Sequence, residues 1–328
     1  MNQEVPPTVP YKDTKIRLVG CGVLTLLAGL LCGLLVPLMW YVLTSVPKSG
    51  TSPNPRFIIP ALAVYGVMAV VLVWLGIGSI MARRWARALI LILCWSILVG
   101  GVIGVAFEAF QFPTLVNTMQ QAAPGQPPLP AGAAMAGFAI GLAFVAGIAM
   151  VLPLIGILAY GSKNTKATCE ARDPVVRWTD RCPLPVLALS IWFLFCALSS
   201  LLILMPLGYL PVFPLFGNFI SGAPAFAAYA VLDAAWVYSA WAMYKLRMSG
   251  WWLTFILMCL LSISGFLTYL NHNISELYQL MGFSQEQIVQ TQKFNFFKGQ
   301  TMAWMTLACG LPWLVYLLFI LKYFRRKA

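Results

Sequence analysis

The chain has 328 residues, of which 61% are hydrophobic and only 9% are charged, and its mean hydropathy is +0.84. A soluble domain carries roughly 25% charged and about 45–50% apolar residues, so a single water-soluble core is excluded and lipid must surround most of the polypeptide. The net charge of +12 comes from basic residues spread over short loops, which argues against a nucleic-acid-binding surface.

Eight apolar stretches reach the length of about 20 residues that a membrane-spanning helix needs. Backbone polar groups find no water in lipid, so each stretch should be helical and the fold class all-α. The first stretch is too long for the apolar region of a cleavable signal peptide, and we expect it to remain as a span. In chain order the stretches lie roughly at residues 18–44, 57–82, 85–107, 131–160, 186–207, 223–244, 251–270 and 299–321.

The polar segment at 161–185 divides these stretches into two groups of four and holds 8 of the 30 charged residues. We therefore expect a charged cytoplasmic linker between two four-span halves. The predicted parts are a cytoplasmic N-terminal tail, a first half, the linker, a second half and a basic cytoplasmic tail, at residues 1–17, 18–160, 161–185, 186–321 and 322–328.

The distribution of Lys and Arg predicts how the chain is oriented. All but four of the 21 basic residues fall in alternate segments between the stretches; the four are Lys48, Arg56, Lys293 and Lys298. Cytoplasmic loops carry the excess of basic residues, so we expect both termini in the cytoplasm. The predicted location is the inner (plasma) membrane of a bacterium, with multiple passes.

The two halves resemble each other in the order of their features. A basic hairpin precedes Trp85 in the first half and Trp251 in the second, and Ser96 and Ser262 follow at the same distance. This order favours a parallel 4+4 repeat, related by an axis along the membrane normal. The alternative is a chance similarity between apolar runs of low diversity.

Two outward loops have a predicted character of their own. The segment at 208–222 is apolar but broken by Pro and Gly, which favours a segment that dips into the interface or into a protein cavity. The segment at 271–298 mixes apolar and polar residues and predicts a short amphipathic helix on the outer face.

One carboxylate lies near the middle of a predicted span. Asp233 stands in the stretch at 223–244, where a carboxylate costs about 2.5–3.5 kcal/mol and usually faces the bundle interior. We predict either a site for a cation, a proton or a polar substrate, or a protonated or hydrogen-bonded Asp that joins two helices. Glu108 is a second candidate, although it lies near enough to the interface to reach water. A cavity shared by the two carboxylates would form a cation path.

His272, the only His, and Glu276 stand four residues apart in the loop at 271–298, so a helix would place them on one face. One His and one carboxylate are fewer than the three protein ligands of a catalytic zinc, and we expect no metal. The pair is predicted to be a hydrogen-bonding or pH-responsive feature of the outer face.

The linker offers five candidates for docking a soluble partner: Arg172, Asp173, Arg177, Asp180 and Arg181. Their alternating sign favours the alternative, a solvated loop that pairs with itself. Cys169 and Cys182 lack the second close pair of a zinc site, and we expect reduced thiols. Small residues at Gly29 and Gly33, and at Gly137 and Gly141, have the spacing that lets helices approach closely.

No catalytic or nucleotide-binding motif occurs, so we expect no enzyme and no cofactor. The leading hypothesis is a transporter-like protein that binds or moves a small or lipid-like molecule between its halves. The first alternative is a non-catalytic structural or accessory subunit of a membrane complex, and the second is a lipid-modifying enzyme embedded in the membrane. The expected partners are the lipid bilayer and other membrane proteins or a second copy, and no nucleic acid.

Overall fold

The computed structural model describes residues 12–45, 55–120, 130–204, 210–283, 285, 288–289 and 299–325. Seven helices in these residues are long and apolar enough to cross a membrane, so the chain is a multi-pass membrane protein that associates with the bilayer. The seven spans are Lys15–Val42, Leu62–Ile80, Arg84–Ala109, Met135–Gly161, Leu184–Leu201, Met248–Asn271 and Gly299–Arg325.

The remaining predicted stretch, at 223–244, is a helix as well, but its hydropathy falls below that of the seven spans. This helix, α8 (Ala223–Tyr244), contains Asp233 together with Tyr and Trp residues, whose polar atoms lower its hydropathy. It packs against two of the spans, α7 (Leu184–Leu204) and α9 (Met248–Asn271). Seven stretches rather than eight therefore qualify as spans by length and composition.

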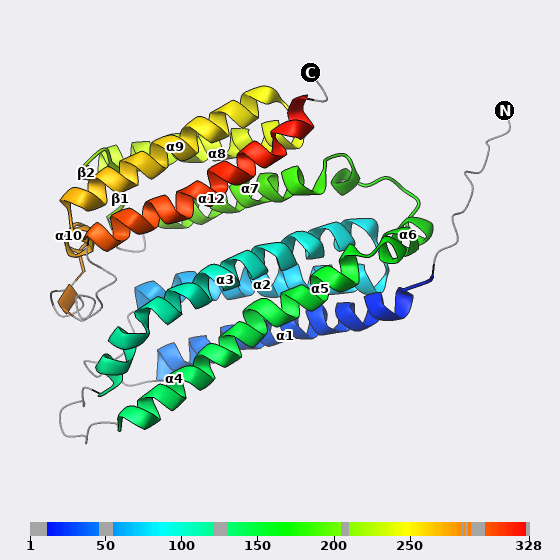
Figure 1. The fold of residues 1–328 in the computed structure, drawn as a ribbon, viewed down its shortest axis with the longest axis horizontal. Coiled ribbons are helices and arrows are strands. Elements are labelled where there is room, and N and C mark those ends of the chain that lie inside the picture. Colours follow the sequence, from blue (N-terminus) through cyan, green and yellow to red (C-terminus); the bar gives the residue numbers. More distant parts are fainter. Residues whose placement is uncertain are drawn as a thin grey trace. The chain divides into compact units, whose positions relative to one another are not determined.

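The chain forms two compact units, which Figure 1 draws in one view. The first unit comprises Met1–Val105 and Phe144–Arg181, and the second comprises Ala106–Ala143 and Cys182–Ala328. The first unit is built on α1 (Lys15–Ser45) and α2 (Pro55–Ile80), which pack along each other.

Glycine allows the close approach of α1 and α2. A Cβ at Gly76 would lie 2.7 Å from the backbone nitrogen of Leu26, and one at Gly29 would lie 2.8 Å from that of Val73. The predicted packing role of Gly29 is therefore confirmed. No described residue comes within 4 Å of a Cβ built on Gly137 or Gly141, so their packing role stays a prediction.

Hydrogen bonds of two hydroxyl groups connect α1, α2 and a third helix of the first unit. Ser79 of α2 donates to the carbonyl of Leu18 at 2.9 Å and shares a hydrogen bond of 2.6 Å with the hydroxyl of Tyr160. Tyr160 belongs to α5 (Leu152–Gly161), and all three side chains are buried. A single hydrogen-bonded cluster therefore connects three helices.

The predicted fourth span is one helical run with a widened turn in it. α4 (Ala131–Ala146) continues through the π-helical segment η1 (Gly147–Val151) into α5. Pro153 follows at once; it lacks an N–H, and its ring crowds the carbonyl of the residue four positions earlier, Ala149, which favours a wider turn there. α3 (Arg84–Gln120) approaches this segment at Gly101, where a Cβ would lie 2.5 Å from the carbonyl oxygen of Ala149.

The turns before α3 and α9 have the same geometry. Ala82 and Leu246 have left-handed φ angles of 52° and 55°. The following residue donates its N–H to the carbonyl of Gly78 in one turn and of Ala242 in the other, each at 2.9 Å. Both turns therefore end their helices with a Schellman motif.

This geometry corrects the alignment of the two tryptophans. The turns make Ala82 equivalent to Leu246, so Trp85 corresponds to Ser249 and not to Trp251. The contacts of the two tryptophans differ accordingly. Trp85 stacks on Trp74 with ring centroids 4.1 Å apart, whereas the indole N–H of Trp251 donates to the carbonyl of Leu317 at 2.9 Å.

The second unit combines α7, α8 and α9 with α12 (Gly299–Arg325) and a β-hairpin of β1 (Val212–Leu215) and β2 (Asn218–Ser221). The strands are antiparallel, with Val212 paired to Ser221. The turn residues Phe216 and Gly217 have positive φ angles of 39° and 96°, as a tight two-residue hairpin requires.

Within the apolar segment predicted at 208–222, residues Val212 to Ser221 thus form a hairpin that is held by α9. The N–H of Phe216 donates to Ser264 Oγ at 2.9 Å, and the N–H of Gly217 donates to Thr268 Oγ1 at 3.0 Å. Ser264 Oγ in turn donates to the carbonyl of Pro214 at 2.9 Å. These bonds satisfy backbone groups that an apolar surrounding would otherwise leave unpaired.

The predicted amphipathic helix is present as α10 (Ile274–Leu280). Asn273 and Glu276 form a capping box at its start, and Ile274 is buried. Residues 290–298 of the same predicted loop lie outside the described residues, as do the basic residues Lys48, Lys293, Lys298, Arg326 and Lys327 of the orientation count.

Candidate functional site

Asp233 lies in the seam between α7 and α8 and is only 8% exposed. Its Oδ1 is hydrogen-bonded to Ser200 Oγ, whereas its Oδ2 has no partner among the described residues. Farther along the seam Phe193 stacks on Trp236 with centroids 5.0 Å apart, and Ser190 Oγ donates to the carbonyl of Ala240 at 2.6 Å. The carboxyl group is therefore one of several contacts that join the two antiparallel helices.

The hydrogen count at Ser200 limits what Asp233 does there. The carbonyls of Cys196 and Ala197 also lie within hydrogen-bond distance of Ser200 Oγ, at 3.0 and 3.1 Å. A hydroxyl has one proton and two lone pairs, so it cannot donate to all three oxygens. If the group at position 233 donates a hydrogen bond to Ser200 Oγ, the serine proton can go to a carbonyl of α7. A carboxylate at position 233 has no proton to donate and competes with these carbonyls for the serine proton.

Glu108 does not complete a two-carboxylate site. It is half-buried in α3, and among the described residues it makes no hydrogen bond or ion pair with Asp233. The cation path that a shared cavity would form therefore lacks support in these contacts.

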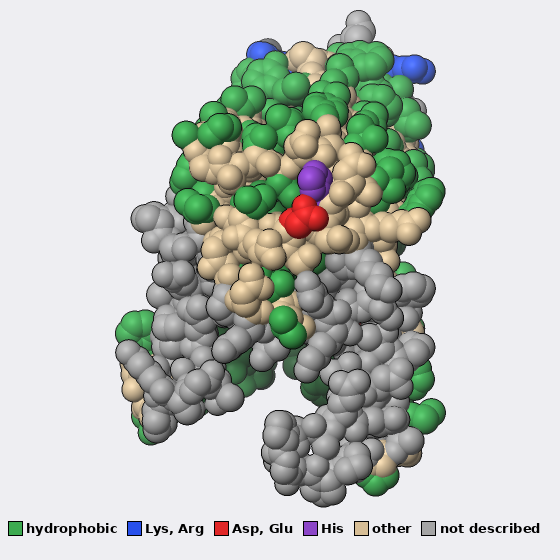
Figure 2. Space-filling view, turned by 90° about the vertical axis from the view of Figure 1, so that its left-hand side faces the viewer, with side chains coloured by type: hydrophobic (Ala, Val, Ile, Leu, Met, Phe, Trp, Pro, Cys, Tyr) green, Lys and Arg blue, Asp and Glu red, His purple; other side chains and the backbone are tan. Residues whose placement is uncertain are grey.

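The predicted contact between His272 and Glu276 is formed. His272 Nδ1 lies 2.6 Å from Glu276 Oε2, and the ring of Phe219 from the β-hairpin lies 5.5 Å from the imidazole. The bond with His272 lowers the pKa of Glu276, because it stabilises the charged carboxylate. Figure 2 shows the histidine (purple) and a carboxylate (red) side by side at the surface.

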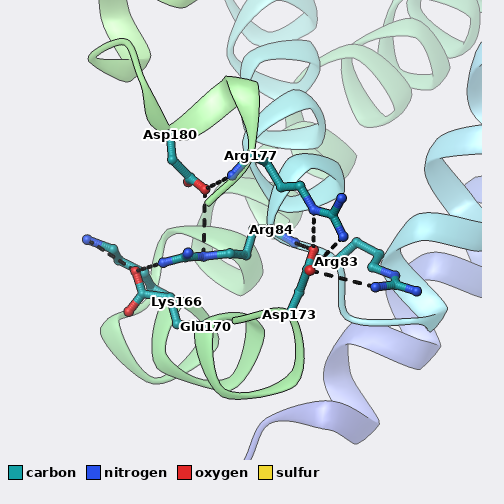
Figure 3. A network of polar contacts seen from close by, with 7 residues as sticks. All are labelled: Arg83, Arg84, Lys166, Glu170, Asp173, Arg177 and Asp180. Carbon is teal, nitrogen blue, oxygen red and sulfur yellow. Dashed lines mark hydrogen bonds and ion pairs between the residues drawn. The ribbon is translucent and has the colours of Figure 1, made fainter. Parts of the chain in front are cut away.

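A second set of charged residues forms an ion-pair cap on the first unit, which we define as Arg83, Arg84, Lys166, Glu170, Asp173, Arg177 and Asp180 (Figure 3). Arg83 lies in the turn before α3, Arg84 is the first residue of α3, and the other members come from the linker. The linker is therefore not a plain solvated loop. It contains α6 (Lys163–Arg172) and the short helix η2 (Trp178–Asp180), and it pairs with a turn about 90 positions earlier in the chain.

Asp173 is the centre of the ion-pair cap. Its side chain is 1% exposed and accepts two hydrogen bonds from the Arg177 guanidinium, at 2.8 and 3.2 Å. The backbone N–H of Arg84 donates to it at 3.4 Å, and Arg83 Nη1 lies 3.6 Å away. The bidentate bond from Arg177 is the main cause that lowers the pKa of Asp173.

The remaining linker residues have separate roles. Arg172 forms an ion pair of 3.0 Å with Asp13, and the hydroxyl of the neighbouring Thr14 lies 3.2 Å from those of Thr165 and Thr168 on α6. This places the start of α1 on α6. Arg181 is exposed, which keeps it available as a docking candidate.

The two predicted linker cysteines are buried, and burial raises the pKa of Cys169 to about 11. A thiol with so high a pKa is a poor nucleophile at neutral pH. In the described residues no group of three His, Cys, Asp or Glu side chains gathers to hold a metal ion. The described contacts of Asp233 and of the ion-pair cap therefore mainly connect helices and turns of the fold.

Compared with known protein families, characterised proteins and solved structures, the chain matches none of them.

Proposed function

We propose that this protein is a non-catalytic accessory subunit that packs with another membrane protein, rather than a carrier for a hydrophilic solute. The observation that supports this best is the engagement of Asp233 in the seam between α7 and α8. A carboxylate in a span is the usual candidate for a solute or ion site, and here one oxygen is bound to Ser200. This hydrogen bond joins α8 to α7.

The exposed face of α4 supports a partner for packing. Gly137 and Gly141, four residues apart, lie open, with no described residue within 4 Å of a Cβ built on them, whereas the space beside Gly29 and Gly76 is filled by a neighbouring helix. Helices associate in lipid through small residues with this spacing. A helix of a second protein, or of a second copy, is the occupant that this face fits.

The transporter-like role is the second candidate, and one atom favours it. Asp233 Oδ2 is buried and makes no hydrogen bond with the described residues. An unpaired carboxyl oxygen in the apolar interior is costly, and a proton or a cation would stabilise it. The lipid-modifying enzyme has less support, because no hydrogen bond or ion pair joins Glu108 to His272 or Glu276 in the described part of the chain.

The prediction that separates these roles concerns Asp233→Asn. An amide N–H can donate to Ser200 Oγ, so the accessory role predicts wild-type insertion and a free energy of unfolding within about 1 kcal/mol of the wild type. Purified protein in vesicles should pass no more Na⁺ or protons than empty vesicles, measured with dyes sealed inside. Flux that wild type supports and a stably folded Asp233→Asn abolishes would contradict the accessory role and favour transport.

We also propose that α8 is an eighth span, that both termini are cytoplasmic and that the halves are a parallel repeat. The alternation of basic residues supports the orientation. The repeat is supported by the matching Schellman turns, in which Gly78 faces Ala86 in one half and Ala242 faces Gly250 at the equivalent place in the other. Glycine precedes the turn and alanine follows it in one half, whereas alanine precedes and glycine follows it in the other. The two helices therefore stay in close contact at this place in both halves.

A labelling experiment on intact cells tests this orientation. A thiol introduced by Lys166→Cys, on the exposed surface of α6, should react with an impermeant maleimide only after the membrane is opened. A thiol introduced by Lys48→Cys should react at once, because its loop has the opposite location. Labelling of Lys166→Cys from outside would overturn the orientation whatever the function of the protein.

A further inference from the structure

The outer surface of α12 carries an apolar groove with a volume of about 590 Å³. The groove is open along one side and lies within the second unit. Its lining residues are Ala308, Leu311, Pro312, Val315, Tyr316 and Phe319. Pro312 lies inside the helix. The side chains of Ala308 and Pro312 are smaller than those of the other lining residues.

The length of the groove corresponds to one leaflet of a bilayer. At 1.5 Å per residue, the helix rises about 16 Å from Ala308 to Phe319. The hydrocarbon core of a membrane is about 30 Å thick, so the groove extends through roughly half of it. Tyr316, which lines the groove, has its hydroxyl bound to the carbonyl of Pro185 at 3.1 Å and therefore presents its ring rather than a polar group.

The end of the groove at Phe319 is positively charged. Lys322 Nζ lies 4.0 Å from the centroid of the Phe319 ring and 5.2 Å from that of Tyr323. Arg325, three residues farther on and thus on the same side of the helix, is exposed. Neither Lys322 nor Arg325 forms an ion pair with an acidic residue of the described chain.

We propose that this groove binds one acyl chain of an anionic phospholipid, whose phosphate is held by Lys322 with Arg325 beside it. The apolar lining contacts the acyl chain, and the ammonium group of Lys322 at the end of the groove favours a headgroup of negative charge. Basic residues where a helix leaves the membrane attract anionic lipids, and a site of one leaflet's depth suits a phospholipid rather than a membrane-spanning partner.

Native mass spectrometry of the full-length protein, equilibrated with equal amounts of phosphatidylglycerol and phosphatidylcholine, tests the proposal. Wild type should retain phosphatidylglycerol in preference. Lys322→Gln should lower the ratio of the two bound lipids about fivefold, the effect of one basic residue near an anionic headgroup. Val315→Trp should fill the groove and reduce the retention of both lipids.

Two matched variants control for changes elsewhere on the surface. Lys245→Gln removes an exposed basic residue at the end of α8, and Val231→Trp enlarges a side chain of α8 that is 71% exposed. Both should bind lipid as wild type does. Equal retention of the two lipids by wild type, or equal losses in test and control variants, would overturn the proposal. So would a dimer or bound protein that Val315→Trp releases, because a protein would then cover the groove.

Discussion

Replacing Asp173 by alanine is expected to reduce the free energy of unfolding of the first unit by about 3 kcal/mol. The guanidinium groups of Arg83 and Arg177 and the backbone N–H of Arg84 converge on this carboxylate, and its removal leaves these donors without their acceptor. The cost stays below that of a fully buried pair, because Arg83 and Arg177 keep about a third of their side chains in water. Denaturant titration of the protein in mixed micelles measures the change.

Asp180→Ala is the matched control for Asp173→Ala. The Asp180 side chain is 32% exposed, lies 3.7 Å from Arg84 Nε and accepts the backbone N–H of Arg177 at 3.0 Å, so its loss should cost about 1 kcal/mol. The cost of Asp173→Ala should also depend on pH. A folded-state pKa below the ordinary value of about 3.9 means that the contribution of Asp173 is present above that pH and is lost as the pH falls through the lowered pKa. A cost for Asp173→Ala no larger than for Asp180→Ala would contradict the central position of Asp173.

The positions of the long helices could be predicted from the sequence because lipid leaves the backbone little choice. The stretch predicted at 131–160 is helical from Ala131 to Gly161, with only the widened turn before Pro153 unforeseen. Hydropathy is a weaker guide where polar atoms enter a helix. α8 has 22 residues, enough to cross a membrane, and one of the residues that lower its hydropathy, Asp233, is hydrogen-bonded to Ser200 of α7.

The β-hairpin at Val212–Ser221 illustrates what hydropathy misses. Its strands have four residues each, too few for an alternating pattern, and Pro214 argues against a strand. The hairpin exists because α9 supplies Ser264 and Thr268 as partners for its turn. Nothing in the segment itself indicates that partners about 50 positions away will be there.

The charged residues divide in the same way. Asp233 and the linker residues could be singled out because charge is rare in this chain. Their partners could not, since the identity of Ser200 depends on which faces of α7 and α8 meet. Arg83 and Arg84 were predicted only as basic residues that orient the chain. Opposite charge in the linker on the same predicted side of the membrane was the one available indication that they pair with Asp173 and Glu170.

Gly76→Ala is expected to destabilise the packing of α1 against α2 by about 2–3 kcal/mol. The added methyl group would lie 2.7 Å from the backbone nitrogen of Leu26 and 2.9 Å from the carbonyl oxygen of Gly22. Backbone atoms cannot turn away as a flexible side chain can, so the two helices must separate. Thermal or denaturant unfolding in micelles, followed through the helical signal, measures the loss.

Gly66→Ala gives this prediction its sharpest control. It makes the same chemical change in the same helix, at a position with nothing within 4 Å of the new methyl group. Alanine is the better helix former by about 1 kcal/mol, so this variant should be unchanged or slightly more stable than wild type. Helix propensity favours alanine at both sites, so the opposite effects of the two substitutions on stability come only from the contact of Gly76 with α1. Equal unfolding of the two variants would mean that α1 and α2 are not in close contact at Gly76.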